Sequence, residues 1–188
     1  MDVGVSTIIL VLISPILLLI AIGIKTTSKG PIVFTQKRNG INNKEIIIYK
    51  FRSMKLQDNE PVVKQATRDD ARKTPIGGFL RKSSLDELPQ FVNVIQGRMS
   101  IVGPRPHAVT HNHEFSKLIP EYNQRTLVKP GITGLAQISG WRGETDTLNK
   151  MQRRVDLDLT YINNWTLWLD IKIIFTTIFK GFTSNSAY

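Results

Sequence analysis

Cysteine is absent from this sequence of 188 residues, which excludes disulfide bonds, thiolate metal ligands and a cysteine nucleophile. Acidic residues are few relative to basic ones: 15 Asp and Glu face 25 Lys and Arg, which gives a formal net charge of +10. A surplus of this size predicts anionic partners, namely phosphates, anionic lipid or nucleic acid. The charge alone does not choose among these three.

The common fingerprints of nucleotide binding and serine hydrolysis are also missing. The sequence contains no G-x-G-x-x-G, no G-x-x-x-x-G-K-[ST] and no G-x-S-x-G. Any bound nucleotide is therefore held by something other than a Rossmann or P-loop fingerprint.

A long apolar run opens the chain. Residues 3–24 carry no charge, and as a helix they would be about 33 Å long, close to the thickness of a bilayer core. A signal peptide needs a basic start and a small-residue cleavage site, whereas Met1-Asp2 precedes the run and residues 21–25 are a poor cleavage site. The run therefore predicts a membrane segment.

Ser14-Pro15 lies in the middle of this run, and proline inside a helix removes one hydrogen bond. Two structures are compatible with this feature. The helix can kink and still cross the membrane, which the residues alone slightly favour. Alternatively it can break and leave by the same face, with the Ser14 hydroxyl satisfying a freed carbonyl. Basic residues follow at positions 25, 29, 37 and 38, which predicts that the rest of the chain is cytoplasmic.

Short elements are expected along the remainder of the chain. A β-hairpin is predicted over residues 32–51, with its turn at 37–40. Helices are predicted to begin at Thr74-Pro75 and at Ser84, over 107–127 and over 148–163, and residues 55–74 read as a mobile surface loop. Residues 165–182 carry aromatic side chains at near-helical spacing, which fits either a helix in the membrane interface or an ordinary core helix.

Asp86-Glu87 is the strongest chemical candidate. A carboxylate can attack phosphorus to form an acyl-phosphate, and a neighbouring carboxylate can hold Mg²⁺ against developing charge. The segment 84–87 also has the S-x-x-E form of a capping box, so the local pattern by itself favours a simple helix cap.

Basic residues flank the acidic pair in the sequence. Arg81 and Lys82 precede it, and Arg98 and Arg105 follow it. Arg105 lies between two prolines, which restrict the backbone and so the direction of a guanidinium that suits phosphate. A histidine cluster over 107–113 with Glu114 is a weaker metal candidate, because it lacks the H-E-x-x-H form.

Taken in order, these motifs resemble the bacterial sugar transferase family, the small monotopic polyprenyl-phosphate phosphoglycosyl transferases. The resemblance runs almost end to end, and the ordered set is far more specific than any single motif. The matching segments are Ser14-Pro15; Gly30-Pro31 with Phe34, Gln36 and Arg38-Asn39-Gly40; 49–54; 81–90; 99–106; and 129–134. One departure is Asn39, where many relatives have Pro or Tyr.

The resemblance implies a ping-pong reaction with Asp86 as the nucleophile on the sugar-linked phosphate of a UDP-sugar. UMP would leave, and undecaprenyl phosphate would accept the phosphosugar. Glu87 would help to hold Mg²⁺, while Arg81 and Arg105, with Lys37 and Arg38, would bind phosphates.

The resemblance also implies an α+β, mostly helical, monotopic membrane protein. Residues 1–29 would form a re-entrant helix-break-helix hairpin with its break at Ser14-Pro15. Residues 30–188 would form the catalytic domain at the cytoplasmic face of the bacterial inner membrane, with a small β-hairpin and an interfacial helix over 165–182. The expected partners are the UDP-sugar, undecaprenyl phosphate and the membrane; a homodimer is allowed for, and no nucleic acid is expected.

The C-terminal part narrows the resemblance to the undecaprenyl-phosphate glucose phosphotransferases of exopolysaccharide synthesis. The segments that carry it are 140–147 and 179–182, and they favour UDP-glucose, followed by UDP-galactose. That subgroup usually has an additional N-terminal membrane region. Two rivals remain: a basic binding module at the membrane surface, and a structural subunit of a membrane assembly. Neither rival explains why Asp86-Glu87 lies among basic residues.

Overall fold

The computed structural model describes residues 1–55, 70–143 and 147–181. Helices dominate, and two small sheets accompany them, which confirms the mostly helical α+β class. The helices and strands in chain order are α1 (Asp2–Thr27), β1 (Val33–Asn39), η1 (Ile41–Asn43), β2 (Glu45–Phe51), α2 (Gly77–Lys82), η2 (Leu85–Glu87), α3 (Gln90–Ile95), β3 (Ser100–Val102), α4 (Val109–Leu118), η3 (Tyr122–Thr126), β4 (Gly131–Thr133), α5 (Leu135–Ile138), α6 (Leu148–Asn163) and α7 (Leu167–Gly181).

The predicted hairpin is confirmed. Strands β1 and β2 pair antiparallel, from Val33 opposite Phe51 to Asn39 opposite Glu45. The predicted turn at 37–40 is wrong, because β1 continues through residue 39 and the chain reverses over residues 40–44. The N–H of Gly40 donates to the carbonyl of Lys44 at 2.8 Å. Two asparagines at 42 and 43 take φ values of 52° and 58°, a region that asparagine tolerates better than most residues.

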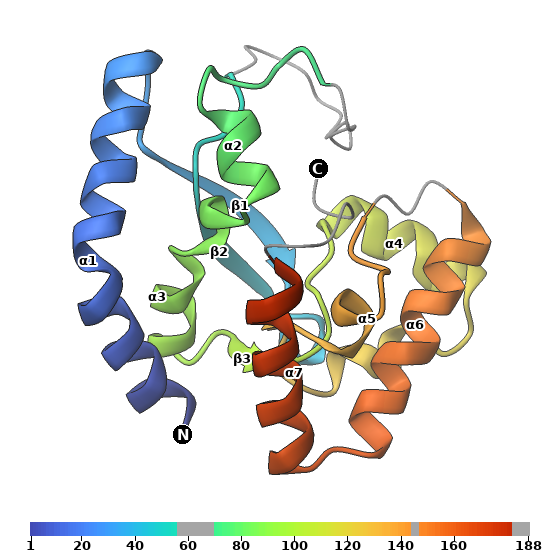
Figure 1. The fold of residues 1–188 in the computed structure, drawn as a ribbon. Helices are drawn as coiled ribbons and strands as arrows, with labels where there is room; N and C mark the ends of the chain where they lie inside the picture. The colour runs from blue at the N-terminus through green and yellow to red at the C-terminus, as the bar shows by residue number, and fades with distance from the viewer. Residues whose placement is uncertain (56–69, 144–146, 182–188) are drawn as a thin grey trace.

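Helix α1 lies along one side of the molecule, with α2 and α3 between it and the β1–β2 hairpin (Figure 1). One face of α1 packs through Ile20 and Ile24 against Phe51 and Leu80. The outward face is apolar: Val11 and Leu12 are 68% and 73% exposed. Among the described residues, α1 is the one helix long and apolar enough to cross a membrane.

The expected break at Ser14-Pro15 is not confirmed, because α1 continues through Pro15. Proline cannot donate to the carbonyl four residues earlier, which belongs to Val11. The hydroxyl of Ser14 donates to that carbonyl at 2.8 Å. The serine thus replaces the bond that the proline removes, and this is the physical reason that the helix can continue.

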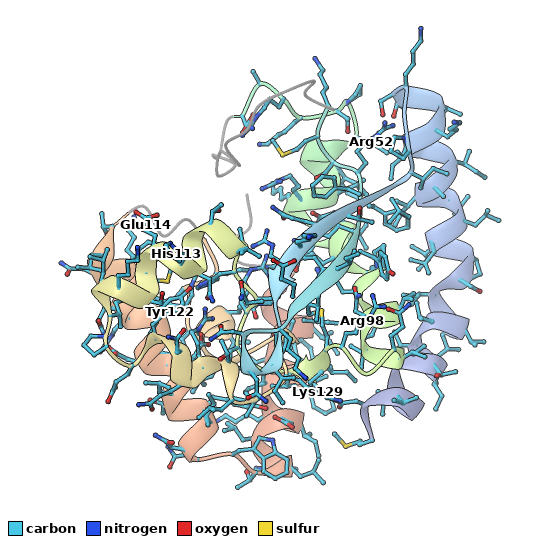
Figure 2. All side chains as sticks on the ribbon, turned by 180° about the vertical axis from the view of Figure 1, so that it is seen from behind. Arg52, Arg98, His113, Glu114, Tyr122 and Lys129 are labelled. Atoms are coloured by element: carbon cyan, nitrogen blue, oxygen red, sulfur yellow. The ribbon has the colours of Figure 1, made fainter. Side chains whose placement is uncertain are left out.

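Both ends of α1 are fastened to the rest of the chain. At the start, the Ser100 hydroxyl in β3 donates to the Asp2 carboxylate at 2.6 Å. At the end, the guanidinium of Arg52 donates to the carbonyls of Ser28 and Lys29 (Figure 2). A cation at a helix C-terminus also compensates the negative end of the helix dipole. The helix is therefore held to the domain at both ends.

The short parallel pair β3–β4 supports the loop that carries Arg105. A Cβ added to Gly131 would lie 2.1 Å from the backbone nitrogen of Gly103, so these two backbone segments approach too closely for a side chain at Gly131. The N–H of Gly103 donates to the carbonyl of Thr133 at 2.8 Å, and the N–H of Gly131 donates to the carbonyl of Pro104 at 2.9 Å. These bonds fix the start of the loop on both sides.

The predicted helices are reproduced to different degrees. The 148–163 helix is confirmed as α6, with Thr147 as its N-cap. The helix expected from Thr74 begins at Gly77, because the Thr74 carbonyl accepts a turn bond from the Gly77 N–H at 2.9 Å. The helix expected over 107–127 is divided into α4 and η3, and Pro120, which has no N–H to donate, lies between them. Of the loop predicted over 55–74, residues 56–69 lie outside the described residues.

Helix α7 has one buried face, as a core helix requires, and one exposed face, while its position in a membrane interface stays a prediction. Ile173 is fully buried in the core, whereas Trp168 and Phe179 are 74% and 69% exposed. The buried Asp170 accepts hydrogen bonds from the Tyr161 hydroxyl at 2.8 Å and from the Trp165 indole at 3.0 Å. One side of the helix is thus core, and the other is an exposed aromatic face. Phe182 lies outside the described residues.

Candidate active site

A sharp bend at Ser84 turns the acidic pair into the protein. Helix α2 ends at Lys82, and Ser84 takes a left-handed backbone conformation, with φ 60° and ψ 14°. A non-glycine residue in this region is uncommon and is enriched at functional sites. After the bend, Asp86 and Glu87 lie in the short helix η2 and are only 7% and 6% exposed.

The capping box predicted at Ser84 is wrong. The Ser84 side chain makes no cap hydrogen bond. Its hydroxyl instead accepts from the guanidinium of Arg142 at 2.6 Å. The Glu87 side chain likewise turns away from the Ser84 N–H, because stronger cationic partners hold it.

Glu87 is the centre of a cationic cluster. Its Oε1 accepts from Lys50 Nζ at 2.8 Å and from Arg105 Nη2 at 2.6 Å. Its Oε2 accepts from Arg105 Nη1 at 3.3 Å and from Arg142 Nη2 at 3.0 Å. Burial alone would raise the pKa of Glu87, but Arg105, Lys50 and Arg142 together hold it well below its ordinary value. Glu87 is therefore a fixed anion.

Asp86 has the opposite environment, although it is the neighbouring residue. Among the residues that the structure describes, its carboxylate makes no hydrogen bond and no ion pair. Burial, followed by the negative charge of Glu87, raises the pKa of Asp86, and the positive charges of Lys50, Arg81 and Arg142 oppose that rise. A buried carboxylate without partners, next to strong cations, is poised to bind or attack an electrophile.

The predicted phosphate-binding residues are brought together in part. Arg105 reaches Glu87, and Arg81 lies close enough for its charge to act on Asp86. Arg38 lies behind Arg105 and donates to the carbonyl of Pro106 at 3.3 Å. Burial and the neighbouring Arg105 lower the pKa of Arg38 to about 10. Lys37 points to the other face of β1, where its side chain is 70% exposed and pairs with Glu45 at 3.0 Å.

Two residues of the cluster were not assigned a role from the sequence. Lys50 interrupts the apolar run of β2, and an isolated charge in such a strand usually has a partner. Arg142 belongs to the Gly-Trp-Arg-Gly segment, which narrows the resemblance without indicating a role for the arginine. Both lie in matching segments, but nothing in the local pattern directs either of them to Glu87.

Within the described residues, the histidine cluster provides no metal site, and the side chain of His111 lies outside that description. His107 is buried, and its Nδ1 lies 2.5 Å from the Tyr122 hydroxyl. His113 and Glu114 lie on the outside of α4, whereas Tyr122 lies in the interior (Figure 2). The described part of the chain contains no group of three or more His, Cys, Asp or Glu side chains able to hold a metal.

Mg²⁺ binding was predicted at Glu87, and the contacts favour its neighbour. Both oxygens of Glu87 are already held by cations, which a metal ion would have to displace. The carboxylate of Asp86 is a hard oxygen donor with no competing partner. Mg²⁺ is commonly bound by one or two carboxylates together with substrate phosphates, so the residues fit an ion held by Asp86 and the phosphates of a ligand.

The fold and the site define a class of protein: a small α+β domain with, among its described residues, one long apolar helix and a buried cluster of cations around a carboxylate. The chain belongs to the bacterial sugar transferase family, because the model of that family matches residues 1–184.

Named relatives agree with this assignment. UDP-glucose:undecaprenyl-phosphate glucose-1-phosphate transferases from Klebsiella pneumoniae and Escherichia coli K12 are 61% and 58% identical over the full chain. A UDP-N-acetylgalactosamine-undecaprenyl-phosphate N-acetylgalactosaminephosphotransferase from Aeromonas hydrophila is 43% identical over 95% of the chain and 42% of its own length. The chain spans about 40% of the length of the first two relatives.

The contrast between Asp86 and Glu87 predicts opposite effects of two isosteric substitutions on stability. Asp86→Asn should raise the free energy of unfolding at pH 7, because it removes a carboxylate whose charged form is penalised by burial. The folded-state pKa of Asp86 is raised, so its charge destabilises the fold above that pKa, and the gain should shrink as the pH falls towards about 4.

Glu87→Gln should lower the free energy of unfolding at pH 7 by about 3 kcal/mol, because it leaves buried cations without their anion. The folded-state pKa of Glu87 is depressed, so its stabilisation is present above about pH 4.3 and is lost as the pH falls through the folded-state value. Thermal unfolding of the detergent-solubilised variants between pH 4 and pH 8 measures both shifts at pH 7 and the pH dependence of the Asp86 effect, and an extension below pH 4 follows the loss of the Glu87 effect. Shifts of the same sign at pH 7 would contradict this electrostatic assignment.

Proposed function

We propose that the chain is a phosphoglycosyl transferase that moves a sugar-1-phosphate from a UDP-sugar to undecaprenyl phosphate and releases UMP. The observation that carries this proposal is the difference in contacts between the neighbouring carboxylates of Asp86 and Glu87. Glu87 gathers Lys50, Arg105 and Arg142, whereas Asp86, one residue away, has no partner among the described side chains.

The charge balance of the site supports a diphosphate ligand. Lys50, Arg105 and Arg142 contact Glu87, and the charges of Arg38 and Arg81 also act within the site. Two carboxylates do not neutralise five cations. Buried charge without a counter-ion is costly, so the surplus favours a strongly anionic ligand, and arginine is well suited to phosphate oxygens.

In the first step, a carboxylate oxygen of Asp86 attacks the phosphorus that carries the sugar. A phosphorus–oxygen bond to UMP breaks, UMP leaves with that bridging oxygen, and an aspartyl phosphosugar remains. The guanidinium groups and Lys50 stabilise the charge on the phosphate oxygens during the transfer.

In the second step, a phosphate oxygen of undecaprenyl phosphate attacks the same phosphorus. The bond to Asp86 breaks, the carboxylate is restored, and the product is an undecaprenyl-diphosphate sugar. When Mg²⁺ is bound, it neutralises negative charge on the donor phosphates, and Asp86 is the residue that would hold it. Glu87 remains paired with its cations and fixes their positions.

Glucose is the proposed sugar, since two relatives with about 60% identity are named for UDP-glucose. A more distant relative is named for an N-acetylgalactosamine donor, so the family fold itself does not restrict the sugar. The proposed setting is surface-glycan synthesis at the cytoplasmic face of the bacterial inner membrane. Homodimerisation stays a prediction from the sequence.

Replacing the proposed nucleophile tests the reaction. Asp86→Asn should reduce UMP release from UDP-glucose and undecaprenyl phosphate by more than about 1000-fold, because an amide cannot form the acyl-phosphate. The same assay with UDP-galactose and UDP-N-acetylgalactosamine should show lower activity of the unchanged chain.

Asp156→Asn is the matched control, because Asp156 lies on α6 and bonds to Gln152 away from the site. It should retain near-normal activity. Full transfer by a folded Asp86→Asn variant would remove Asp86 as the nucleophile. A protein that binds membranes and releases no UMP from any of the three donors would instead favour a binding or structural role.

We also propose that both ends of α1 lie on the same side of the membrane as the catalytic domain. The contacts at the two ends of α1 support this topology: Asp2 bonds to Ser100, and Ser28 at the other end bonds to Arg52. A helix that crossed the bilayer away from the domain would break one of these contacts. The exposed apolar faces of α1 and α7 would then meet lipid from one side, as in interfacial helices.

Cysteine labelling tests this topology, and the absence of native cysteine makes single-cysteine variants simple to prepare. Gly4→Cys and Lys37→Cys are suitable, because a Cβ at Gly4 meets no atom within 4 Å and the Lys37 side chain is 70% exposed. An impermeant maleimide should label both variants from the cytoplasmic side of oriented vesicles. Labelling of the two sites from opposite sides would restore a spanning helix.

A further inference from the structure

Helix α6 lies behind the cationic cluster and carries two buried charges on one face. Arg154 and Asp158 are 5% and 2% exposed, and their spacing of four residues places them on the same side of the helix. Neither of them contacts Glu87. Each is instead hydrogen-bonded, directly or through another residue, to a loop that carries one of the two arginines paired with Glu87.

The first connection runs from Arg154 to the loop of Arg142. The guanidinium of Arg154 donates to the carbonyl of Trp141 at 2.9 Å and to the carbonyl of Gly143 at 2.6 Å. These two carbonyls flank Arg142 on either side. Holding both of them fixes the backbone from which Arg142 reaches Glu87 and Ser84.

The second connection runs from Asp158 to the loop of Arg105. The Asp158 carboxylate accepts from Arg125 Nε at 3.0 Å and from its Nη2 at 2.6 Å. The same Nη2 donates to the carbonyl of Arg105 at 2.7 Å. Arg125 is 4% exposed, so it forms a buried ion pair with Asp158. The additional hydrogen bond from its Nη2 fixes the carbonyl of Arg105 next to the site.

His107 lies between the two connections. Its Nδ1 is 2.6 Å from Arg125 Nη1, and its Nε2 is 3.4 Å from Arg154 Nη1. Burial, followed by the charges of Arg125 and Arg154, holds the pKa of His107 well below its ordinary value. A neutral imidazole can accept a hydrogen bond among arginines without adding a further positive charge.

We propose that Arg154 is a positioning residue for donor binding, which acts through the backbone on either side of Arg142. This inference rests on the proposed transferase function. Arg154 makes no ion pair within the described residues, although the charge of Asp158 acts on it, and none of its hydrogen bonds goes to a carboxylate. Its donors go to main-chain carbonyls, and a guanidinium can bridge two carbonyls that a shorter side chain cannot reach together.

The kinetic test is a double-mutant cycle in the full chain. Arg154→Gln should lower kcat/KM for UDP-glucose by about 10- to 100-fold, mainly through KM, because misplacement by about 1 Å can cost this much. In the Arg142→Ala background, Arg154→Gln should cost no more than about twofold further, because its target is already absent. In an Arg105→Ala background, it should retain most of its effect.

Arg153→Gln is the matched control, since Arg153 is the exposed neighbour on the same helix. It should leave kcat/KM unchanged. Should Arg154→Gln fail to fold, Arg154→Lys takes its place in the same cycle, because it keeps the charge and loses the two-carbonyl bridge. Effects of residues 154 and 142 that multiply in the double variant would overturn the proposal.

Amide hydrogen exchange of the 136–143 segment gives a readout that does not depend on catalysis. Arg154→Gln should increase exchange there, including at the Trp141 amide that bonds to Ala136, whereas Arg153→Gln should not. Unchanged exchange with a folded Arg154→Gln protein would refute the positioning role. Absence of transfer by the unchanged chain would refute the proposed function instead, and the exchange result would still decide whether Arg154 holds the loop.

Discussion

The carboxylate of Glu87 is the interaction on which the site depends. It joins strand β2 through Lys50, the Pro-Arg-Pro loop through Arg105, and the segment after α5 through Arg142. These three cations would repel one another without a shared anion. A buried anion with three such partners is therefore the constraint that sets the positions of the surrounding loops.

The same constraint explains why the adjacent carboxylate is available for chemistry. Because Glu87 takes the strong hydrogen-bond donors, Asp86 remains buried without a partner, next to a field of positive charge. The left-handed backbone at Ser84 contributes to this arrangement by turning both side chains inward. Proteins often place strained backbone and raised carboxyl pKa values where reactivity is needed, at a cost in stability.

Sequence analysis could predict the elements whose signals are local. The hairpin over 32–51 follows from two short β-like runs, and the charged segment 148–163 was predicted to be helical; both are present. Asp86, Glu87 and Arg105 could be selected because the ordered motifs resemble a family. Lys37 and Arg38 were predicted together as phosphate-binding residues, whereas β1 continues through Asn39 and places their side chains on opposite faces of the strand.

The rest of the site could not be predicted because its contacts span long separations in the chain. Lys50 and Arg142 lie 37 and 55 residues from Glu87, and no local periodicity encodes such pairs. The capping box at Ser84 had a valid local pattern, but a contact with Arg142 replaced the cap. The break at Ser14-Pro15 was expected from the family resemblance, whereas the residues alone slightly favoured a kinked helix; α1 continues, and the Ser14 hydroxyl bonds to the carbonyl that the proline leaves free.

The central claim is that Asp86 becomes covalently attached to the phosphosugar, and the most direct measurement is the intact mass of the protein. The chain would be incubated with UDP-glucose and Mg²⁺ without undecaprenyl phosphate, and then digested to locate any adduct. The account predicts a mass increase of one glucose phosphate on the peptide that contains Asp86, its absence in Asp86→Asn, and its loss when undecaprenyl phosphate is added. Complete transfer by a protein that never carries this adduct would contradict the account.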